Sequence, residues 1–478
     1  MKRKSGVLMH ISSLPGDYSC GSFGKEARDF IDFLAECGFS YWQTLPFCLI
    51  DECNSPYKSY SAFGGNPYFI DLPSLAHEGL LTEDELLHER QQSPYSCEFV
   101  RLYHNRINIL SKAADRADAS LRRKISEFIE ANEYLKQFCE FMALKSANNQ
   151  LPWTDWTVEV YDADCLFMWQ FIQYEFFTQW QKIKAYANSK GIKIIGDIPI
   201  YVSFDSCDVY ANREQFLLDK DNYPSCVAGV PPDYFAQDGQ LWGNPIYNWE
   251  KMHEDGYKWW RARLAHNLSL FDGVRIDHFR AISEYWSVDG KAKTAKEGKW
   301  IKGPGKEFVD MINEIAKDSL IIAEDLGDID EKVIDLVKYS GFPGMRVFQF
   351  GFLSDNDNPH QPHNYINNCI AYTGTHDNNT LLGYVWELSD TARKGMLEYC
   401  GYTDTNWDNG YYSIIKTFFA SHAGTVILPI QDLLGFGSDT RLNIPGKADG
   451  NWAYRVTAEQ INSIDKQKYK RLNYLYRR

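Results

Sequence analysis

The chain has 478 residues, 44% of them hydrophobic and 24% charged, which is typical of a soluble globular protein with two or three domains or one large barrel. Its formal net charge of −14 argues against nucleic acid or an anionic membrane surface as a partner. The eleven cysteines include no CxxC pair, and no apolar run is long enough for a signal peptide or a membrane span, which predicts a reduced, cytoplasmic protein.

Short apolar segments rich in β-branched residues alternate along the chain with helix-length segments. The predicted strands are 5–11, 39–46, 192–200, 271–279, 319–327, 344–352, 369–377 and 424–432. The predicted helices between them are 25–37, 164–189, 259–268, 306–318, 330–339 and 410–422. Continuous apolar runs are typical of parallel strands covered on both faces. Eight such strands fit an α/β fold of the (β/α)8 TIM-barrel type better than an open sheet.

Two long insertions interrupt this pattern, so the barrel is predicted to comprise 1–47 and 164–478. Residues 48–163 are too many for an ordinary loop and are predicted to form a mostly helical subdomain over the catalytic face. The helical stretches within it are predicted at 83–90, 99–117 and 119–147. Residues 201–248 are rich in Gly, Pro and aromatic residues and are predicted to be a loop insertion within the barrel.

Charged residues gather at the ends of four predicted strands. They are Asp197, Asp277 with His278, Glu324 with Asp325, and His376 with Asp377. A TIM barrel has its active site at the C-terminal ends of its strands, where side chains from several strands meet. Four such ends carrying carboxylates therefore predict one catalytic constellation.

Two carboxylates that face one bond indicate glycoside chemistry. Arg275 lies two residues before Asp277 and should share its side of the strand, lowering the pKa of that carboxyl by about 1–3 units and keeping it ionised as a nucleophile. Glu324 follows the apolar run 320–323, where burial would raise its pKa and suit a general acid. By itself the Arg275–Asp277 pair could equally be structural. The 15% of aromatic residues either fill the core or stack on sugars, and composition leaves both open.

Several motifs resemble those of the 4-α-glucanotransferases of the amylomaltase (disproportionating enzyme) family, in the α-amylase-like clan. The clan motif R-x-D is matched by Arg275 and Asp277, the acid/base strand by "AEDLGD" and the third carboxylate by "GTHDN". Family-specific segments are "HISSLPG" (10–16), "SPYKSYSAFGGNPYFIDL" (55–72), "GDIPIYV" (196–202), "VPPDYFAQDGQLWGNP" (230–245) and "FPGMRVFQF" (342–350). The resemblance extends over essentially the whole chain.

The resemblance implies catalytic roles for three carboxylates. Asp277 would be the nucleophile, Glu324 the acid/base and Asp377 the stabiliser of the transition state. The substrate-binding residues that it implies are Arg275, His376, Tyr57, Asp197, Ser55, Trp242 and His278. No metal and no cofactor is expected.

The implied activity is a retaining transfer of α-1,4-linked glucan segments from a glucan donor to glucose or a maltooligosaccharide. The loop 229–244, with Tyr234, Phe235 and Trp242, is interpreted as a cover that excludes water from the intermediate, or alternatively as an ordinary buried aromatic loop. The alternatives for the whole chain are an α-glucan hydrolase, a phosphorylase, or a barrel that binds glucan without catalysis. The motif "DIPIYV" lacks the His of many α-amylases, which speaks against a plain amylase. A monomer or weak homo-oligomer is expected.

Overall fold

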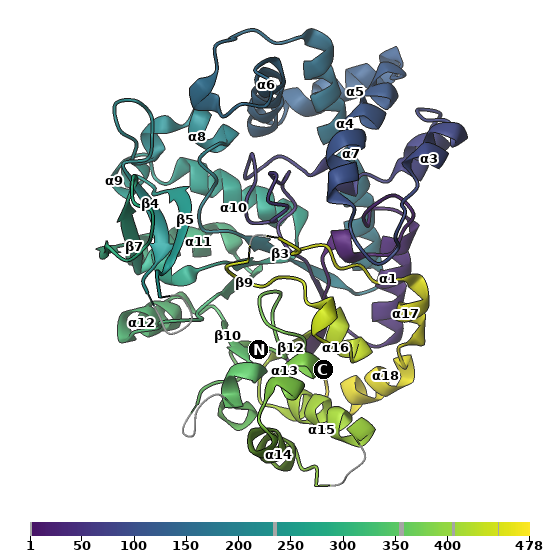
Figure 1. Ribbon diagram of the computed structural model, residues 1–478, viewed down its shortest axis with the longest axis vertical. Coiled ribbons are helices and arrows are strands. Elements are labelled where there is room, and N and C mark those ends of the chain that lie inside the picture. Colours follow the sequence, from purple (N-terminus) through teal and green to yellow (C-terminus); the bar gives the residue numbers. More distant parts are fainter. Residues whose placement is uncertain (1, 233–236, 353–357, 404–406, 448) are drawn as a thin grey trace.

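A closed barrel of eight parallel strands forms the centre of the computed structural model, which describes residues 2–232, 237–352, 358–403, 407–447 and 449–478 (Figure 1). The strands are β1 (Lys4–Leu8), β2 (Tyr41–Gln43), β3 (Lys193–Ile198), β6 (Gly273–Ile276), β9 (Leu320–Ala323), β10 (Gly344–Val347), β11 (Cys369–Tyr372) and β12 (Thr425–Pro429). Each pairs with the next in chain order, and β12 closes the barrel on β1. The predicted barrel is confirmed, and each of its strands is shorter than predicted.

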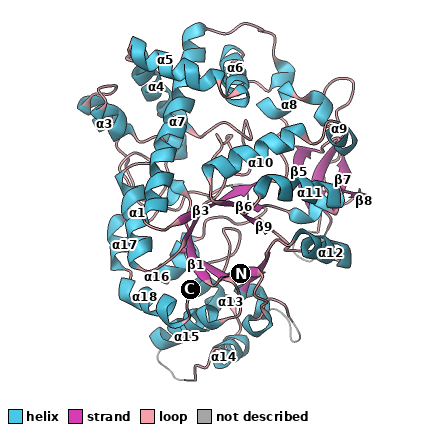
Figure 2. Ribbon diagram, turned by 180° about the vertical axis from the view of Figure 1, so that it is seen from behind, coloured by secondary structure: helices cyan, strands magenta, loops and turns pink. Residues whose placement is uncertain are grey.

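Helices surround the barrel on its outside, as the view from behind shows (Figure 2). The helices predicted between the strands are α1 (Lys25–Glu36), α7 (Ala163–Ser189), α10 (Lys258–Leu270), α11 (Gly305–Ala316), α12 (Glu331–Ser340) and α15 (Trp407–Ala420). Trp42 of β2 and Trp180 of α7 are fully buried between the two layers, and the Phe47 ring lies 4.6 Å from that of Trp180. Burial of such large aromatic side chains is a main source of the stability of the shell.

Smaller helices complete the C-terminal part of the chain. They are α13 (Leu381–Glu387), α14 (Asp390–Tyr399), α16 (Ile430–Leu434), α17 (Ala458–Ser463) and α18 (Lys466–Leu475). Of these, α16 begins directly after β12, and α13 follows β11 after a loop of eight residues, so both lie beyond the C-terminal ends of barrel strands. Within the described residues, no helix is both long and apolar enough to span a membrane.

The insertion between β2 and β3 is mostly helical. Its helices are α2 (Leu72–His77), α3 (Glu83–Glu89), α4 (Phe99–Asp115), α5 (Ala119–Glu130) and α6 (Glu133–Ala147). The prediction of one helix over 119–147 is wrong, because the chain leaves the helical conformation at Asn132 (φ −130°, ψ 79°). The Asn132 side chain donates a hydrogen bond to the Phe128 carbonyl, a local bond of the kind that competes with helix continuation. The helices α4, α5 and α6 pack on α7 at one end of the molecule (Figure 1).

The segment predicted as a loop, 201–248, includes regular elements of secondary structure. It contains α8 (Cys207–Ala211) and two strands, β4 (Cys226–Val230) and β5 (Gln240–Pro245), and is followed by α9 (Trp249–Glu254). With β7 (Glu284–Asp289) and β8 (Gly298–Lys302), these strands form an antiparallel sheet in the order β5-β4-β7-β8. A side chain at Gly229 would meet the Gln240 carbonyl oxygen at 2.5 Å, so the close pairing of β4 and β5 requires glycine there. Because glycine is uncommon within strands, it hid the strand pattern in the sequence.

Candidate active site

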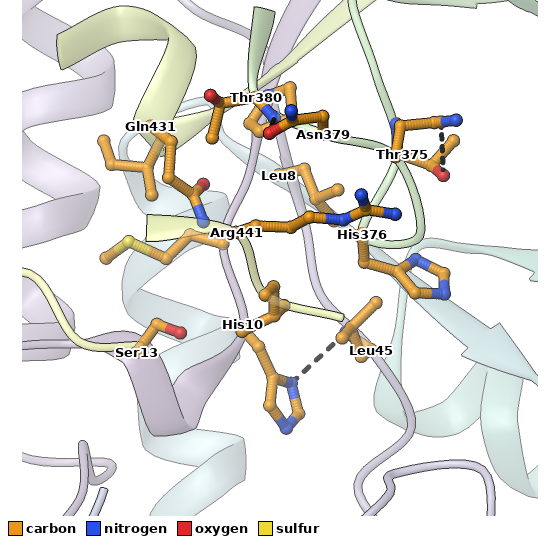
Figure 3. Close-up of a pocket in the computed structure, with 15 residues that line it drawn as sticks. Leu8, His10, Ser13, Leu45, Thr375, His376, Asn379, Thr380, Gln431 and Arg441 are labelled. Atoms are coloured by element: carbon orange, nitrogen blue, oxygen red, sulfur yellow. Dashed lines mark hydrogen bonds between the residues drawn. The ribbon is translucent and has the colours of Figure 1, made fainter. Parts of the chain in front are cut away.

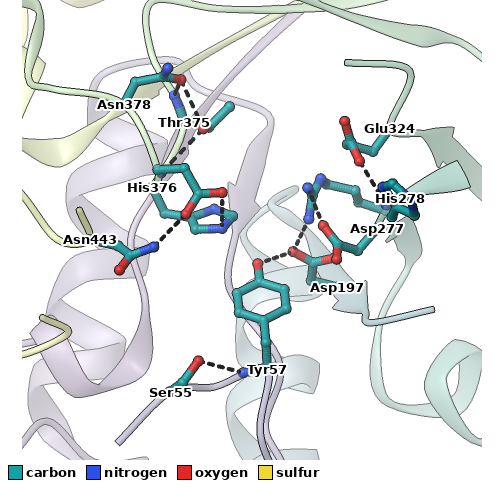
Figure 4. Close-up of polar contacts among 12 residues, drawn as sticks. Ser55, Tyr57, Asp197, Asp277, His278, Glu324, Thr375, His376, Asn378 and Asn443 are labelled. Atoms are coloured by element: carbon teal, nitrogen blue, oxygen red, sulfur yellow. Dashed lines mark hydrogen bonds and ion pairs between the residues drawn. The ribbon is translucent and has the colours of Figure 1, made fainter. Parts of the chain in front are cut away.

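The predicted carboxylates lie together at the C-terminal end of the barrel (Figure 4). Asp197 is in the last part of β3, and Asp277 and Glu324 directly follow the neighbouring strands β6 and β9. Asp377 follows β11 at a distance of five residues, and its neighbour His376 lies across the site from Asp277 (Figure 4). The parallel order of the strands thus brings four carboxylates from four strands to the same end of the barrel.

Arg275 connects two of these carboxylates. Its Nη1 lies 2.5 Å from Asp197 Oδ2 and its Nη2 lies 2.6 Å from Asp277 Oδ1. The Asp197 side chain is fully buried, whereas that of Asp277 is 27% exposed. Burial raises the pKa of Asp197, and the Arg275 guanidinium opposes that rise. The arginine therefore fixes one oxygen of Asp277 against a buried anchor, while the Asp277 side chain stays partly open to solvent.

Glu324 is buried and held by two backbone N–H groups. Its Oε2 accepts a hydrogen bond from His278 N at 2.7 Å, and its Oε1 accepts one from Leu326 N at 2.9 Å. The His278 backbone is left-handed (φ 51°, ψ 50°), which is uncommon for a residue other than glycine and aims its N–H at the carboxylate. Burial raises the pKa of Glu324 to about 7, with Arg275 opposing and Asp277 adding to the rise. Such a group can both donate and accept a proton near neutral pH.

Asp377 is held in its ionised form. Asn443 Nδ2 donates to its Oδ1 at 2.6 Å, and His376 Nε2 lies 3.1 Å from its Oδ2. Burial alone would raise the pKa of Asp377, but the charge of His376 and the hydrogen bonds from both neighbours lower it to about 2. Burial likewise opposes protonation of His376, yet the Asp377 charge outweighs it and raises the pKa of that imidazole. The two groups therefore stabilise each other as an ion pair.

Sequence reasoning missed Asn443 and Arg441. Arg441 Nη2 donates to the Asp377 carbonyl at 2.6 Å, so both residues of this segment donate hydrogen bonds to the same aspartate. They lie beyond α16 in a stretch without helical or strand periodicity, where the only signal was an Arg and an Asn before a Pro-Gly pair.

An aromatic wall adjoins the carboxylates. The Tyr57 ring is stacked on the His376 imidazole with centroids 5.1 Å apart, and its hydroxyl donates to Asp197 Oδ2 at 2.7 Å. The Trp452 ring, which sequence reasoning also missed, lies 5.9 Å from Tyr57. Ser55 Oγ accepts a hydrogen bond from Tyr57 N at 3.3 Å and lies on the far side of Tyr57 from the carboxylates (Figure 4). In the structure, Ser55 thus contacts the backbone of Tyr57.

Trp242 of β5 reaches the same site from the antiparallel sheet. Its ring meets the His278 imidazole edge-on at 4.8 Å, and its Nε1 donates to Gln240 Oε1 at 3.2 Å. Burial lowers the pKa of His278 to about 4, so the imidazole facing Trp242 is neutral at pH 7. Tyr234 and Phe235, also predicted to cover the site, lie outside the described residues.

A small cavity of about 20 Å³ lies beneath the loop that carries His376 and Asp377 (Figure 3). It is lined by His10 of the β1 end, Thr380 of the loop and Gln431 of α16, among others. Burial lowers the pKa of His10 to about 3, and its Nδ1 accepts a hydrogen bond from Leu45 N at 3.4 Å. A cavity of this size has room for about one water molecule. In the described part of the chain, no three His, Cys, Asp or Glu side chains are grouped to hold a metal ion.

The fold and the site together define a TIM-barrel enzyme that acts on glycosidic bonds. The chain belongs to the 4-alpha-glucanotransferase family, whose model matches residues 9–460. It is similar to the 4-alpha-glucanotransferase of Clostridium butyricum (42% identity, covering 98% of this chain and 100% of the other). It is also similar to that of Streptococcus pneumoniae serotype 4 (41% identity, covering 100% and 98%).

Among solved structures, the amylomaltase from Streptococcus agalactiae in complex with acarbose superposes with a TM-score of 0.95 at 38% identity, over 100% of both chains. The amylomaltase from Corynebacterium glutamicum has a TM-score of 0.81 at 17% identity, over 99% of this chain and 75% of the other, and shares the fold. The predicted family is thereby confirmed. The family favours glucan transfer over hydrolysis, phosphorolysis and binding without catalysis.

Proposed function

We propose that the enzyme moves segments of α-1,4-linked glucan from a donor chain to the 4-hydroxyl of glucose or a maltooligosaccharide, through a glycosyl ester on Asp277. One observation carries this proposal. An arginine-bound carboxylate that is partly open to the cleft stands beside a buried carboxyl whose pKa is raised to about 7. Two carboxyl groups with such different surroundings suit a nucleophile and an acid/base in a retaining double displacement.

In the first step, an oxygen of Asp277 attacks the anomeric carbon while Glu324 gives its proton to the glycosidic oxygen. The bond to the leaving sugar breaks as the ester to Asp277 forms. Because Arg275 holds Oδ1 at 2.6 Å, the attacking atom is Oδ2, to which no described side chain donates a hydrogen bond. Asp377, with its pKa lowered to about 2, stays ionised and stabilises the positive charge that develops on the sugar ring.

In the second step, the Glu324 carboxylate takes the proton of an acceptor 4-hydroxyl. The acceptor oxygen attacks the anomeric carbon, the ester bond breaks, and Asp277 returns as a carboxylate. A pKa of about 7 lets Glu324 release and recover the proton with little loss of driving force.

The remaining site residues position the sugar. Tyr57, whose hydroxyl is fixed by Asp197, offers its ring to the sugar at the cleaved bond, and Ser55 holds the Tyr57 backbone. Arg275 and His376 border the same sugar, while Trp242 with His278 borders the acceptor. In this proposal, each of these residues contacts the glucan directly or positions a residue that does.

We propose a reducing compartment, the cytoplasm, as the working environment. All eleven cysteines are unpaired thiols, and most of them are buried in the fold. Oxidising compartments favour disulfides instead. A monomer or weak homo-oligomer stays the prediction for the assembly.

The product ladder from maltotriose tests the activity. Transfer predicts glucose together with oligomers longer than maltotriose, at a constant total of reducing ends. A rising number of reducing ends without longer products would indicate hydrolysis. Sugar phosphates formed on addition of inorganic phosphate would indicate phosphorolysis. Either result would contradict the proposed function.

Replacement of Trp242 by alanine is expected to raise the ratio of hydrolysis to transfer. The indole covers His278 at the acceptor side, and its removal opens a path for water to the glycosyl ester. The measurement is the accumulation of reducing ends from maltotriose relative to longer oligomers. Loss of uniform binding would instead raise KM with kcat unchanged.

Two other variants serve as controls for Trp242→Ala. Trp286 belongs to the same sheet but packs against Val227, Val288 and Ala295, so Trp286→Ala should leave the ratio unchanged. Tyr57→Ala should slow hydrolysis and transfer together. If Trp242→Ala also slows both equally, the tryptophan is a binding wall and not a cover against water.

A further inference from the structure

Both ends of the loop that carries Asp377 reach one buried carboxylate. The loop, 373–381, connects β11 to α13. Thr373 Oγ1 donates to Asp432 Oδ2 at 2.5 Å, and Leu381 N donates to Asp432 Oδ1 at 2.8 Å. Asp432 lies in α16, directly after the neighbouring strand β12, and its side chain is fully buried. The carboxylate therefore ties the beginning and the end of the loop to the adjacent barrel unit.

A gap in the packing lies below part of this loop. The cavity of about 20 Å³ separates it from the start of α16 and from the β1 end (Figure 3). On that side the loop is held by polar anchors, since a void provides no van der Waals contact. Gln349 Nε2 donates to Asn379 O at 2.7 Å, and Arg441 Nη2 donates to Asp377 O at 2.6 Å, each holding one point of the loop. Among the described residues, Asp432 is the one side chain that holds both ends.

The chemistry of Asp432 is unfavourable for the fold alone. No described basic side chain pairs with it, and burial raises the pKa of its carboxyl to about 7. An unpaired buried carboxyl destabilises a fold relative to a well-packed apolar side chain of similar volume. An aspartate at this position is explained by the two hydrogen bonds that it accepts at the ends of the catalytic loop.

We propose that Asp432 is a positioning residue, which sets loop 373–381 so that the Asp377 carboxylate faces the charge developing at the anomeric carbon. Asp432 itself is fully buried, and its carboxylate accepts hydrogen bonds from Thr373 and Leu381 and not from a group of the catalytic carboxyls. The inference rests on the proposed role of Asp377 in transition-state stabilisation. Misplacement of such a group by about 1 Å lowers the rate by about 10²-fold.

Asp432→Leu keeps the branching of the side chain, places methyl groups where the two oxygens lie, and removes both hydrogen bonds. We expect kcat with maltotriose to fall about 100-fold with KM changed less than about threefold, because the loop loses its geometry and not a sugar contact. In contrast to Asp432→Leu, the conservative variant Asp432→Asn should keep a kcat within about fivefold of that of the original enzyme. Its amide oxygen accepts from Leu381 N while its NH2 donates to the Thr373 hydroxyl, so both anchors stay.

Glu175 provides a matched control for a general loss of stability. It is another buried carboxyl, on α7, with its pKa raised to about 7 and with Glu78 and Lys182 as charged neighbours. Glu175→Leu replaces a buried carboxyl by the same apolar side chain as Asp432→Leu does, so it reports any general effect on Tm, and it should leave kcat unchanged at temperatures where both are folded. Should Asp432→Leu fail to fold, Thr373→Val removes one anchor with little change of shape and is expected to lower kcat about tenfold.

The outcomes separate this inference from the function on which it rests. Loss of kcat in Asp377→Asn together with normal kcat in folded Asp432→Leu or in Thr373→Val would overturn the positioning role alone. Full activity in Asp377→Asn would overturn the proposed role of Asp377. A kcat loss in Glu175→Leu equal to that in Asp432→Leu would also overturn the positioning role, because it would reduce the effect to stability.

Discussion

Asp277→Asn lowers the rate of transfer between maltotriose molecules by about 10⁴-fold or more, since removal of a nucleophile abolishes the covalent route. The amide is isosteric, and Arg275 keeps its buried partner Asp197 at 2.5 Å, so the barrel stays folded. Neither amide atom carries the charge needed to attack the anomeric carbon. The measurement is the initial rate of glucose release, with circular dichroism to verify the fold and mass spectrometry to exclude deamidation.

Asp328→Asn is the matched control for this substitution. Asp328 follows Glu324 by four residues, its side chain is 79% exposed, and its carboxylate lies 3.8 Å from Arg280 Nη1. We expect its rate to stay within about twofold, as for most changes of exposed charges. Asp277→Asn protein that keeps more than about 5% of the rate without deamidation would show that another group is the nucleophile, because loss of a true nucleophile leaves far less.

Glu324→Gln has the second largest expected effect. Transfer from maltotriose falls by about 10³-fold, the size typical of a lost general acid/base. A glycosyl fluoride needs no protonation of its leaving group, so the first step still proceeds with this donor. Because the variant lacks the base for the second step, fluoride is released in a burst and the glycosyl ester accumulates. Absence of the burst, with fold intact, would contradict the acid/base role.

The pH dependence of kcat/KM gives an independent measure of Glu324. The leaving sugar requires the protonated carboxyl, whose pKa is raised to about 7 by burial, so kcat/KM with maltotriose should fall as the pH rises above that value. With a glycosyl fluoride donor, this fall should vanish. An unchanged basic limb with the fluoride would assign the titration to another group.

The barrel could be predicted from sequence because its strands are buried on both faces and therefore appear as continuous apolar runs. The runs overestimated the strands for a physical reason. In the run 271–279, pairing ends at Ile276, because Asp277 and His278 turn out of the ladder into the cleft. The polar ends of the runs 271–279 and 319–327 thus lie beyond the sheet at the candidate site, and for this reason the strand ends indicated Asp277 and Glu324.

Other parts of the site had no local signal. Asn443 donates to a carboxylate 66 residues earlier in the chain, and the segment that carries it lacks periodicity. Asp432 shows a different limit of sequence-based prediction. It ends the eighth predicted strand, much as Asp197 lies near the end of the third, so by position alone it would be expected in the site. Its side chain points into the protein beneath the catalytic loop and not into the cleft. Sequence alone gives the residue type at a strand end but not which neighbour its side chain reaches.

The location of the covalent sugar tests the central claim most directly. Glu324→Gln protein is incubated with a maltosyl fluoride, quenched in acid, digested and analysed by peptide mass spectrometry. The account predicts that the glycosyl mass is carried by the peptide containing Asp277 and that fragmentation places it on that side chain. Addition of glucose before the quench should not remove it, because the variant lacks the base. A glycosyl ester on Asp197, on Asp377 or on no carboxylate, with fluoride still released, would contradict the proposed mechanism.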